Sequence, residues 1–150
     1  MRVIKKRELK QILASHKRWL ETRFSNEPQG GRANLSGLDL SKRNFSELNL
    51  DCADLSNSDL SDSNLSHMNL NGANLSNANF DSANLSKANL NEANLSHTNF
   101  NRANLSDIIL NKADLSGTNF NEANLTRADL RNTNRDNANF SRADLTWAKC

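Results

Sequence analysis

The side chains that could do chemistry in this chain are scattered, and they form no catalytic or metal-binding set. His16, His67 and His97 are isolated from one another, and Cys52 and Cys150 lie far apart. A metal site needs His, Cys, Asp or Glu at short spacings, and a nucleophile needs a base beside it. Neither such a spacing nor a glycine-rich phosphate loop occurs. We therefore expect no enzyme activity, no metal, no cofactor and no small-molecule substrate.

The charge of the chain is small overall but unevenly distributed. The formal net charge is +2, yet residues 1–31 carry eight Lys/Arg and three Asp/Glu, whereas residues 32–125 carry six and eleven. No apolar run approaches the roughly 20 residues of a membrane span, and no continuous apolar region suggests a secretory signal. We expect no membrane partner. With two cysteines too distant for a disulfide, we expect a cytoplasmic protein.

One amphipathic helix is predicted over residues 5–24. Its apolar positions recur at three- and four-residue spacings, with Lys, Arg and Glu on the opposite side. Pro28, Gly30 and Gly31 then end the helical pattern. This basic helix suits nucleic acid or a membrane surface, or it serves as a cap for the element that follows.

From Leu35 to Leu145 a five-residue pattern continues without a shift in register. Leu or Phe fills 22 of the 23 positions at this spacing, Arg135 being the exception, and Asn or Asp precedes all but one. Steps of five suit neither an α-helix, where they advance about 140°, nor a β-strand, where they alternate between faces. The pattern predicts short extended segments separated by corners. Asn and Asp suit the corners because their side chains bind nearby backbone.

Four of the phenylalanines indicate how many segments close one coil. Phe80, Phe100, Phe120 and Phe140 recur every twenty residues, which indicates four segments per coil. Coils stacked at the strand spacing of about 4.8 Å would then form an all-β solenoid of about six coils. Its expected structural axis includes Leu75, Phe80, Leu85, Leu90, Leu95, Phe100, Leu105, Phe120 and Phe140.

These residues resemble the pentapeptide-repeat family, whose motif is Ala-Asp/Asn-Leu-x-x in tandem. The segments ANLSN (73–77), ANLSK (83–87), ANLNE (88–92) and ADLSG (113–117) match that motif. The resemblance implies a right-handed quadrilateral β-helix, with Leu, Phe and the small residue pointing inward. It also implies an activity known for some members, which mimic duplex DNA and bind topoisomerases such as gyrase, protecting against quinolones.

The N-terminal helix is expected to cap this solenoid, because a first coil otherwise exposes its apolar end. The capping residues are expected to be Leu9, Ile12, Leu13, Trp19 and Leu20. Leu38, Leu48 and Met68 replace the usual small residue in the early coils and would enlarge the apolar floor. Arg43, at another such position, is expected to reach solvent or an acid of the helix. The predicted domains are the capping helix with its linker, 1–31, and the pentapeptide-repeat β-helix, 32–150.

The last coil also needs cover, and two solutions remain open. Arg135 and Trp147 could fold over its apolar end as a cap. Alternatively, two chains could form a homodimer through this end, with Trp147 as the anchor and Cys150 near the two-fold axis.

The expected function is that of a non-catalytic interaction scaffold whose partner is another protein of unknown identity. The alternative is a DNA-mimicking ligand or inhibitor of a type II topoisomerase (DNA gyrase) of the quinolone-resistance type. Such mimicry calls for a strongly acidic surface, which the central net charge does not provide. Ile108 and Ile109 interrupt the pattern: Ile108 should face inward, and Ile109 marks either a partner contact or sequence drift.

Overall fold

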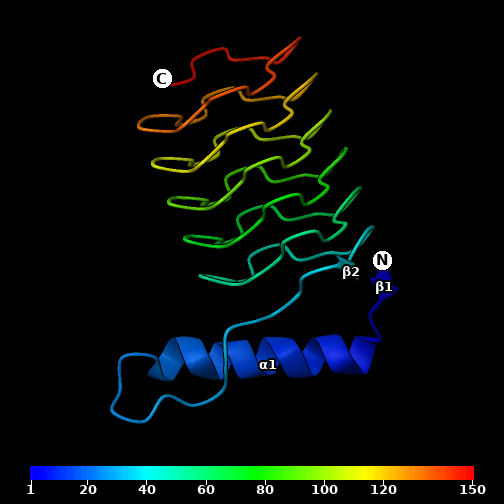
Figure 1. Cartoon of the computed structure of the whole chain (residues 1–150), viewed down its shortest axis with the longest axis vertical. Coiled ribbons are helices and arrows are strands. Elements are labelled where there is room, and N and C mark those ends of the chain that lie inside the picture. Colours follow the sequence, from blue (N-terminus) through cyan, green and yellow to red (C-terminus); the bar gives the residue numbers. More distant parts are fainter.

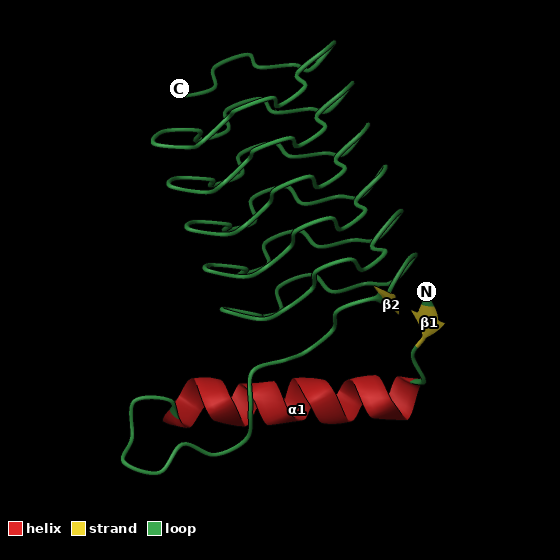
Figure 2. Cartoon of the chain, in the orientation of Figure 1, coloured by secondary structure: helices red, strands yellow, loops and turns green.

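The computed structural model describes all 150 residues as one short helix and a stack of coils. The named elements are β1 (Arg2–Val3), α1 (Lys6–Thr22) and β2 (Leu38–Asp39). Helix α1 lies across one end of the stack, and the chain then climbs away from it coil by coil (Figure 1). Figure 2 shows that nearly all of the stack lies outside extended strands, because each straight segment is very short. No helix has the length and apolar character needed to cross a membrane.

Each coil takes twenty residues. Parallel bridges join every segment to the one twenty residues later, as in Asn34 with Asp54 and Asn74 with Asn94. Four five-residue segments therefore complete one circuit. The four phenylalanines form one column, with successive ring centroids 5.0, 5.4 and 4.8 Å apart. The twenty-residue spacing thus places the four rings on one wall.

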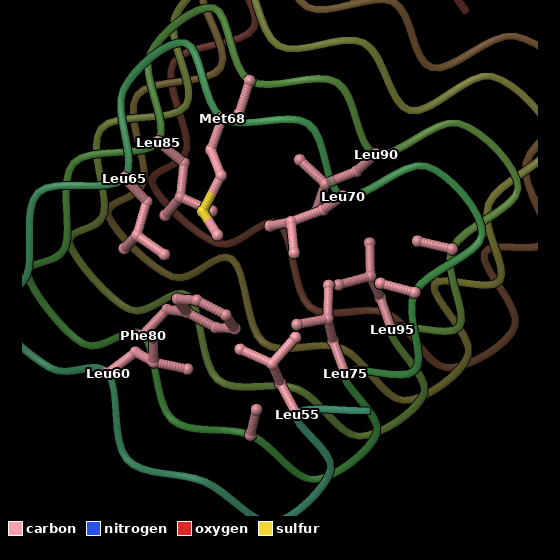
Figure 3. Close-up of a cluster of buried hydrophobic side chains, with 14 of the residues drawn as sticks. Leu55, Leu60, Leu65, Met68, Leu70, Leu75, Phe80, Leu85, Leu90 and Leu95 are labelled. Atoms are coloured by element: carbon pink, nitrogen blue, oxygen red, sulfur yellow. The ribbon is translucent and has the colours of Figure 1, made fainter. Parts of the chain in front are cut away.

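The Leu and Phe side chains fill the axis of the stack, as expected from the five-residue period. In Figure 3 the labelled leucines, Phe80 and Met68 point from the surrounding walls toward one another. Eight of the nine named axial residues are completely buried: Leu75, Phe80, Leu85, Leu90, Leu95, Phe100, Leu105 and Phe120. Phe140, in the last coil, is only partly buried. Burying one such side chain contributes roughly 1.5–3 kcal/mol, so the axis is the main source of stability.

Two features form each corner. The side-chain oxygen of the Asn or Asp accepts the backbone N–H two residues later, as Asp59 does from Ser61 at 3.0 Å. The residue two positions after the axial Leu or Phe then adopts a left-handed conformation, with φ between 56° and 64° at non-glycine positions of the stack. Asn and Asp tolerate this region best, and other residues adopt it at a cost. Backbone hydrogen bonds to the neighbouring coils hold this left-handed residue in place.

The N-terminal segment contributes a strand that the sequence pattern did not predict. Strand β1 pairs in parallel with β2, with Arg2 opposite Leu38, so it extends the stack beyond the first coil. Ile4, next to β1, is buried with 2% of its surface exposed. Arg43 donates from Nη2 to the carbonyl oxygen of Ile4 at 3.1 Å. Arg43 is only partly exposed, and its partner is this backbone carbonyl and not an acid of the helix.

Helix α1 is held against the returning chain by hydrogen bonds to its polar side chains. Thr22 accepts the N–H of Gln29 at 2.7 Å, and Ser15 accepts that of Gly31 at 3.1 Å. Gly30 has φ +75°, and a Cβ there would lie 2.2 Å from the carbonyl oxygen of Ser15. This close approach requires glycine, and it fixes the linker to the helix.

Candidate interaction surfaces

The outer walls carry ladders of asparagine side chains that link consecutive coils. Asn99 donates from Nδ2 to the side-chain oxygen of Asn79 at 2.9 Å, and Asn119 donates to Asn99 at 3.0 Å. The same oxygen of Asn99 accepts the backbone N–H of Asn101 at 3.1 Å. Each asparagine thus closes its own corner and binds its neighbours, which makes the walls rigid platforms.

Ion pairs between coils neutralise much of the acidity of the walls. The pairs are Arg102 with Asp81 at 2.9 Å, Lys112 with Glu92 at 3.2 Å, Arg127 with Asp107 at 2.8 Å and Arg142 with Glu122 at 3.2 Å. Within one coil, the hydrogen bond from Arg131 lowers the pKa of Asp129 to about 2. Exposed pairs of this kind add at most about 1 kcal/mol each, so their main effect is on surface charge.

On one wall an apolar side chain occupies a ladder position that Asn or Asp fills elsewhere in the stack. Ile109 occupies the ladder position between Asn89 and Asp129, and 40% of its surface is exposed. Ile108 is fully buried, as predicted. The exposed apolar side chain of Ile109 in an otherwise polar column makes the wall a candidate partner surface.

The junction between α1 and the first coils contains a buried ion pair. Arg23 pairs with Asp51, and its guanidinium lies 5.2 Å from the ring centroid of Trp19 and 4.9 Å from that of Phe24. Burial tends to raise the pKa of Asp51, but hydrogen bonds from Asn71 and Arg23 outweigh this effect, and the pKa is lowered. The pair joins the end of the helix to the coil.

His16 lies at the same junction as a buried acceptor. Its exposed fraction is 1%, and its Nδ1 accepts the backbone N–H of Ala33 at 3.0 Å. The ring stacks on Trp19 with centroids 5.6 Å apart, and Nε2 has no hydrogen-bond partner. Burial lowers the pKa of His16, Arg23 adds to this effect, and Asp51 opposes it. His16 is therefore held in the neutral form.

The expected capping residues lie on the stack side of α1, to different depths. Leu9 is buried, whereas Ile12 and Leu13 are partly buried against the core together with Leu48. Trp19 and Leu20 are half-buried. A groove of about 540 Å³ remains beside the helix, lined by Leu13, Ala14, Lys17, Leu20, Glu21, Glu47, Leu48 and Asn49.

The opposite end of the stack is uncovered. Trp147 is 82% exposed, and Arg135 and Cys150 are also exposed. Leu145 is 39% exposed. Arg135 and Trp147 therefore do not fold beneath the last coil. Trp147 lies at a left-handed corner, which points away from the axis. The dimer through this end stays a prediction.

The chemically reactive side chains do not gather into a site. No group of three His, Cys, Asp or Glu side chains is placed to hold a metal ion. Both cysteines are free, and burial raises the pKa of the Cys52 thiol, which disfavours the nucleophilic thiolate. The features that remain as candidate contact surfaces are the walls and the two ends of the stack.

Solved structures with similar folds are pentapeptide repeat proteins. HetL, from the cyanobacterium Nostoc sp. and involved in the regulation of heterocyst differentiation, is 32% identical with a TM-score of 0.60. That match covers 79% of this chain and 60% of HetL, so the chain spans about three fifths of that relative. A protein of the Arabidopsis thaliana thylakoid lumen is 34% identical with a TM-score of 0.62, over 64% of this chain and 67% of that one.

QnrB1, a plasmid-mediated fluoroquinolone resistance protein, is 24% identical with a TM-score of 0.50, over 77% of this chain and 63% of that one. This likeness concerns the fold. A comparison with curated proteins gives no match.

Family models cover the coils almost completely. The model for pentapeptide repeats matches residues 31–66, 58–96 and 69–107, with eight copies. The model for a pentapeptide repeat region matches residues 91–149. The chain therefore belongs to the pentapeptide-repeat family.

Proposed function

We propose that the chain is a non-catalytic scaffold that binds another protein through the wall carrying Ile109. In this proposal it forms a right-handed quadrilateral β-helix of about six coils, capped at one end by α1. The supporting observation is the ladder position of Ile109, where 40% of the residue's surface is exposed. A partner that covers Ile109 would bury this apolar surface. The two free cysteines suit the cytoplasm as its location.

A type II topoisomerase such as DNA gyrase is the alternative partner. A DNA mimic needs a dense negative surface, because duplex DNA carries one charge per about 1.7 Å of its axis. Here five wall carboxylates are paired with Arg or Lys. We therefore expect no inhibition in a gyrase supercoiling assay at high protein concentration. Inhibition by the wild type would favour the alternative.

The proposal is tested by restoring the ladder with Ile109→Asn. This variant removes the exposed apolar side chain and supplies an amide able to donate to the side-chain oxygen of Asn89, so its melting temperature should stay equal or rise. A candidate partner is recovered on immobilised wild type, identified by mass spectrometry, purified and titrated calorimetrically against both proteins.

We expect its binding to be lost with Ile109→Asn and kept with the matched control Lys87→Asn on another wall. Equal binding to wild type and Ile109→Asn would refute the proposed surface.

A further inference from the structure

The solvent side of α1 carries two straight rows of cations. At about 100° per residue, Lys6, Lys10 and Lys17 fall within about 40° of one another, and Arg7 and Arg18 form a second row about 100° away. All five side chains are exposed. At 1.5 Å per residue each row extends over about 16 Å, and the two rows together form a basic face interrupted by Gln11 and Ala14.

These five cations have no acidic partner, and unlike the unpaired coil lysines they lie together on one helix. The only ion pairs of the N-terminal segment are Arg2 with Glu8 and Arg23 with Asp51. On the coils, by contrast, five Lys or Arg side chains pair with an acid. Glu21 is the one acid of α1 exposed near the rows. The basic face therefore keeps its charge available for an anion.

The surroundings of the basic face favour phosphates over a lipid surface. A helix that binds a membrane interface inserts an apolar face, but the apolar side of α1 already packs on the first coil through Leu9 and Leu13. The exposed apolar side chains nearby, Val3 and Phe24, lie before and after the helix. The rows contain no aromatic side chain on which unpaired bases could stack, so a duplex backbone fits better than a single strand.

We propose that the two rows, Lys6–Lys10–Lys17 and Arg7–Arg18, bind the phosphates of duplex nucleic acid without reading its sequence. Lysine supplies point charges and arginine supplies bidentate donors for phosphate oxygens. Residues 32–125 carry eleven Asp/Glu against six Lys/Arg, so the sides of the stack repel a duplex. The duplex therefore lies across the α1 end. This surface does not depend on the Ile109 wall.

The test is fluorescence anisotropy of a labelled duplex of arbitrary sequence, titrated with the full chain at several salt concentrations. Five phosphate contacts predict a slope of log K against log salt of about −4.5. The triple variant Lys6→Ala/Lys10→Ala/Lys17→Ala should make the slope shallower by about 2.7. The matched control Lys42→Ala/Lys87→Ala/Lys149→Ala removes three exposed, unpaired coil lysines, and it should leave both slope and affinity unchanged.

Three results would overturn the proposal: no duplex binding at low salt, equal loss in both triple variants, or tighter binding to vesicles of phosphatidylserine and phosphatidylcholine than to the duplex at the same salt. Melting curves accompany both variants. Exposed lysines should leave the melting temperature unchanged, so a lost affinity reports on contacts and not on folding.

Discussion

At the scale of single residues, the asparagine before an axial Leu or Phe makes two kinds of hydrogen bond, one within its corner and one between coils. Its oxygen closes the corner by accepting the backbone N–H two residues later, as Asn99 does from Asn101. Its amide group reaches the previous coil, as Asn99 does to Asn79. The local bond was predictable from the preference of Asn for turns. The bond between coils was not, because it depends on the register of residues twenty apart.

The first prediction concerns this double role. Asn99→Ala removes the bond to Asn101 and both ladder bonds, and should lower the free energy of unfolding by about 1–3 kcal/mol. Asn99→Ser keeps a side-chain acceptor for the Asn101 N–H and loses the bonds between coils, so it should cost less. Urea denaturation of the three proteins measures both changes. Equal losses would show that the acceptor contributes nothing.

The second prediction compares an axial and an outward position two residues apart. Leu85 is completely buried, so Leu85→Asp places an unpaired charge in the axis and should unfold or fray the middle of the stack. Lys87 is exposed and has φ +60°, a conformation that Asp tolerates. Lys87→Asp should therefore change the free energy of unfolding by less than about 1 kcal/mol. Thermal melts followed by circular dichroism measure both, and similar losses would contradict the assigned register.

At the scale of elements, the coils were more predictable than the N-terminal segment. The five-residue period determines which side chains face inward, because every coil repeats the same constraint. Strand β1 was missed since two residues carry no periodicity, although Val3 and Ile4 are β-branched. The helix was predicted over 5–24 and spans Lys6–Thr22. The Arg23–Asp51 pair was also missed, because it joins residues that only the folded linker brings together.

The third prediction concerns the pH dependence of the helix junction. The pKa of His16 is lowered from 6.5 in the folded chain, so the unfolded chain binds the proton more tightly. Stability should therefore be full above about pH 6.5 and should decrease as the pH falls toward the folded pKa. Protonation of Nδ1 also removes the acceptor for the Ala33 N–H. Asp51 faces His16 and moderates the effect, whereas Arg23 reinforces it.

The matched variant is His16→Asn, whose side-chain oxygen can accept the Ala33 N–H and does not titrate. Thermal melts between pH 7.5 and 5, a range above the ordinary pKa of Asp, compare the two proteins. Wild type should lose melting temperature through this range, and His16→Asn should not. A parallel decrease in both would assign the effect to other groups.

At the scale of the whole molecule, the two ends of the stack are unlike. One end is closed by β1 and α1, whose apolar residues pack on the first coil. At the other end Leu145 is 39% and Trp147 82% exposed. A stack with one open and one closed end cannot associate head to tail into fibres. It can pair only through its like ends, which gives a closed two-fold dimer.

The last prediction is that such a dimer forms, with Trp147 as its anchor. Pairing would bury Leu145 and Phe140 of both chains, and a Trp in the centre of an interface commonly contributes about 2 kcal/mol or more. The last 25 residues carry five Lys/Arg and three Asp/Glu, so two such ends repel weakly. Added salt should screen this repulsion and strengthen the dimer, the opposite of its effect on nucleic-acid binding.

Multi-angle light scattering at several protein and salt concentrations should show a concentration-dependent rise toward twice the monomer mass for the wild type. Trp147→Ala should shift that rise to higher concentration, while the matched control Lys87→Ala should not. A wild type that stays monomeric at high concentration and high salt would rule out pairing through this end.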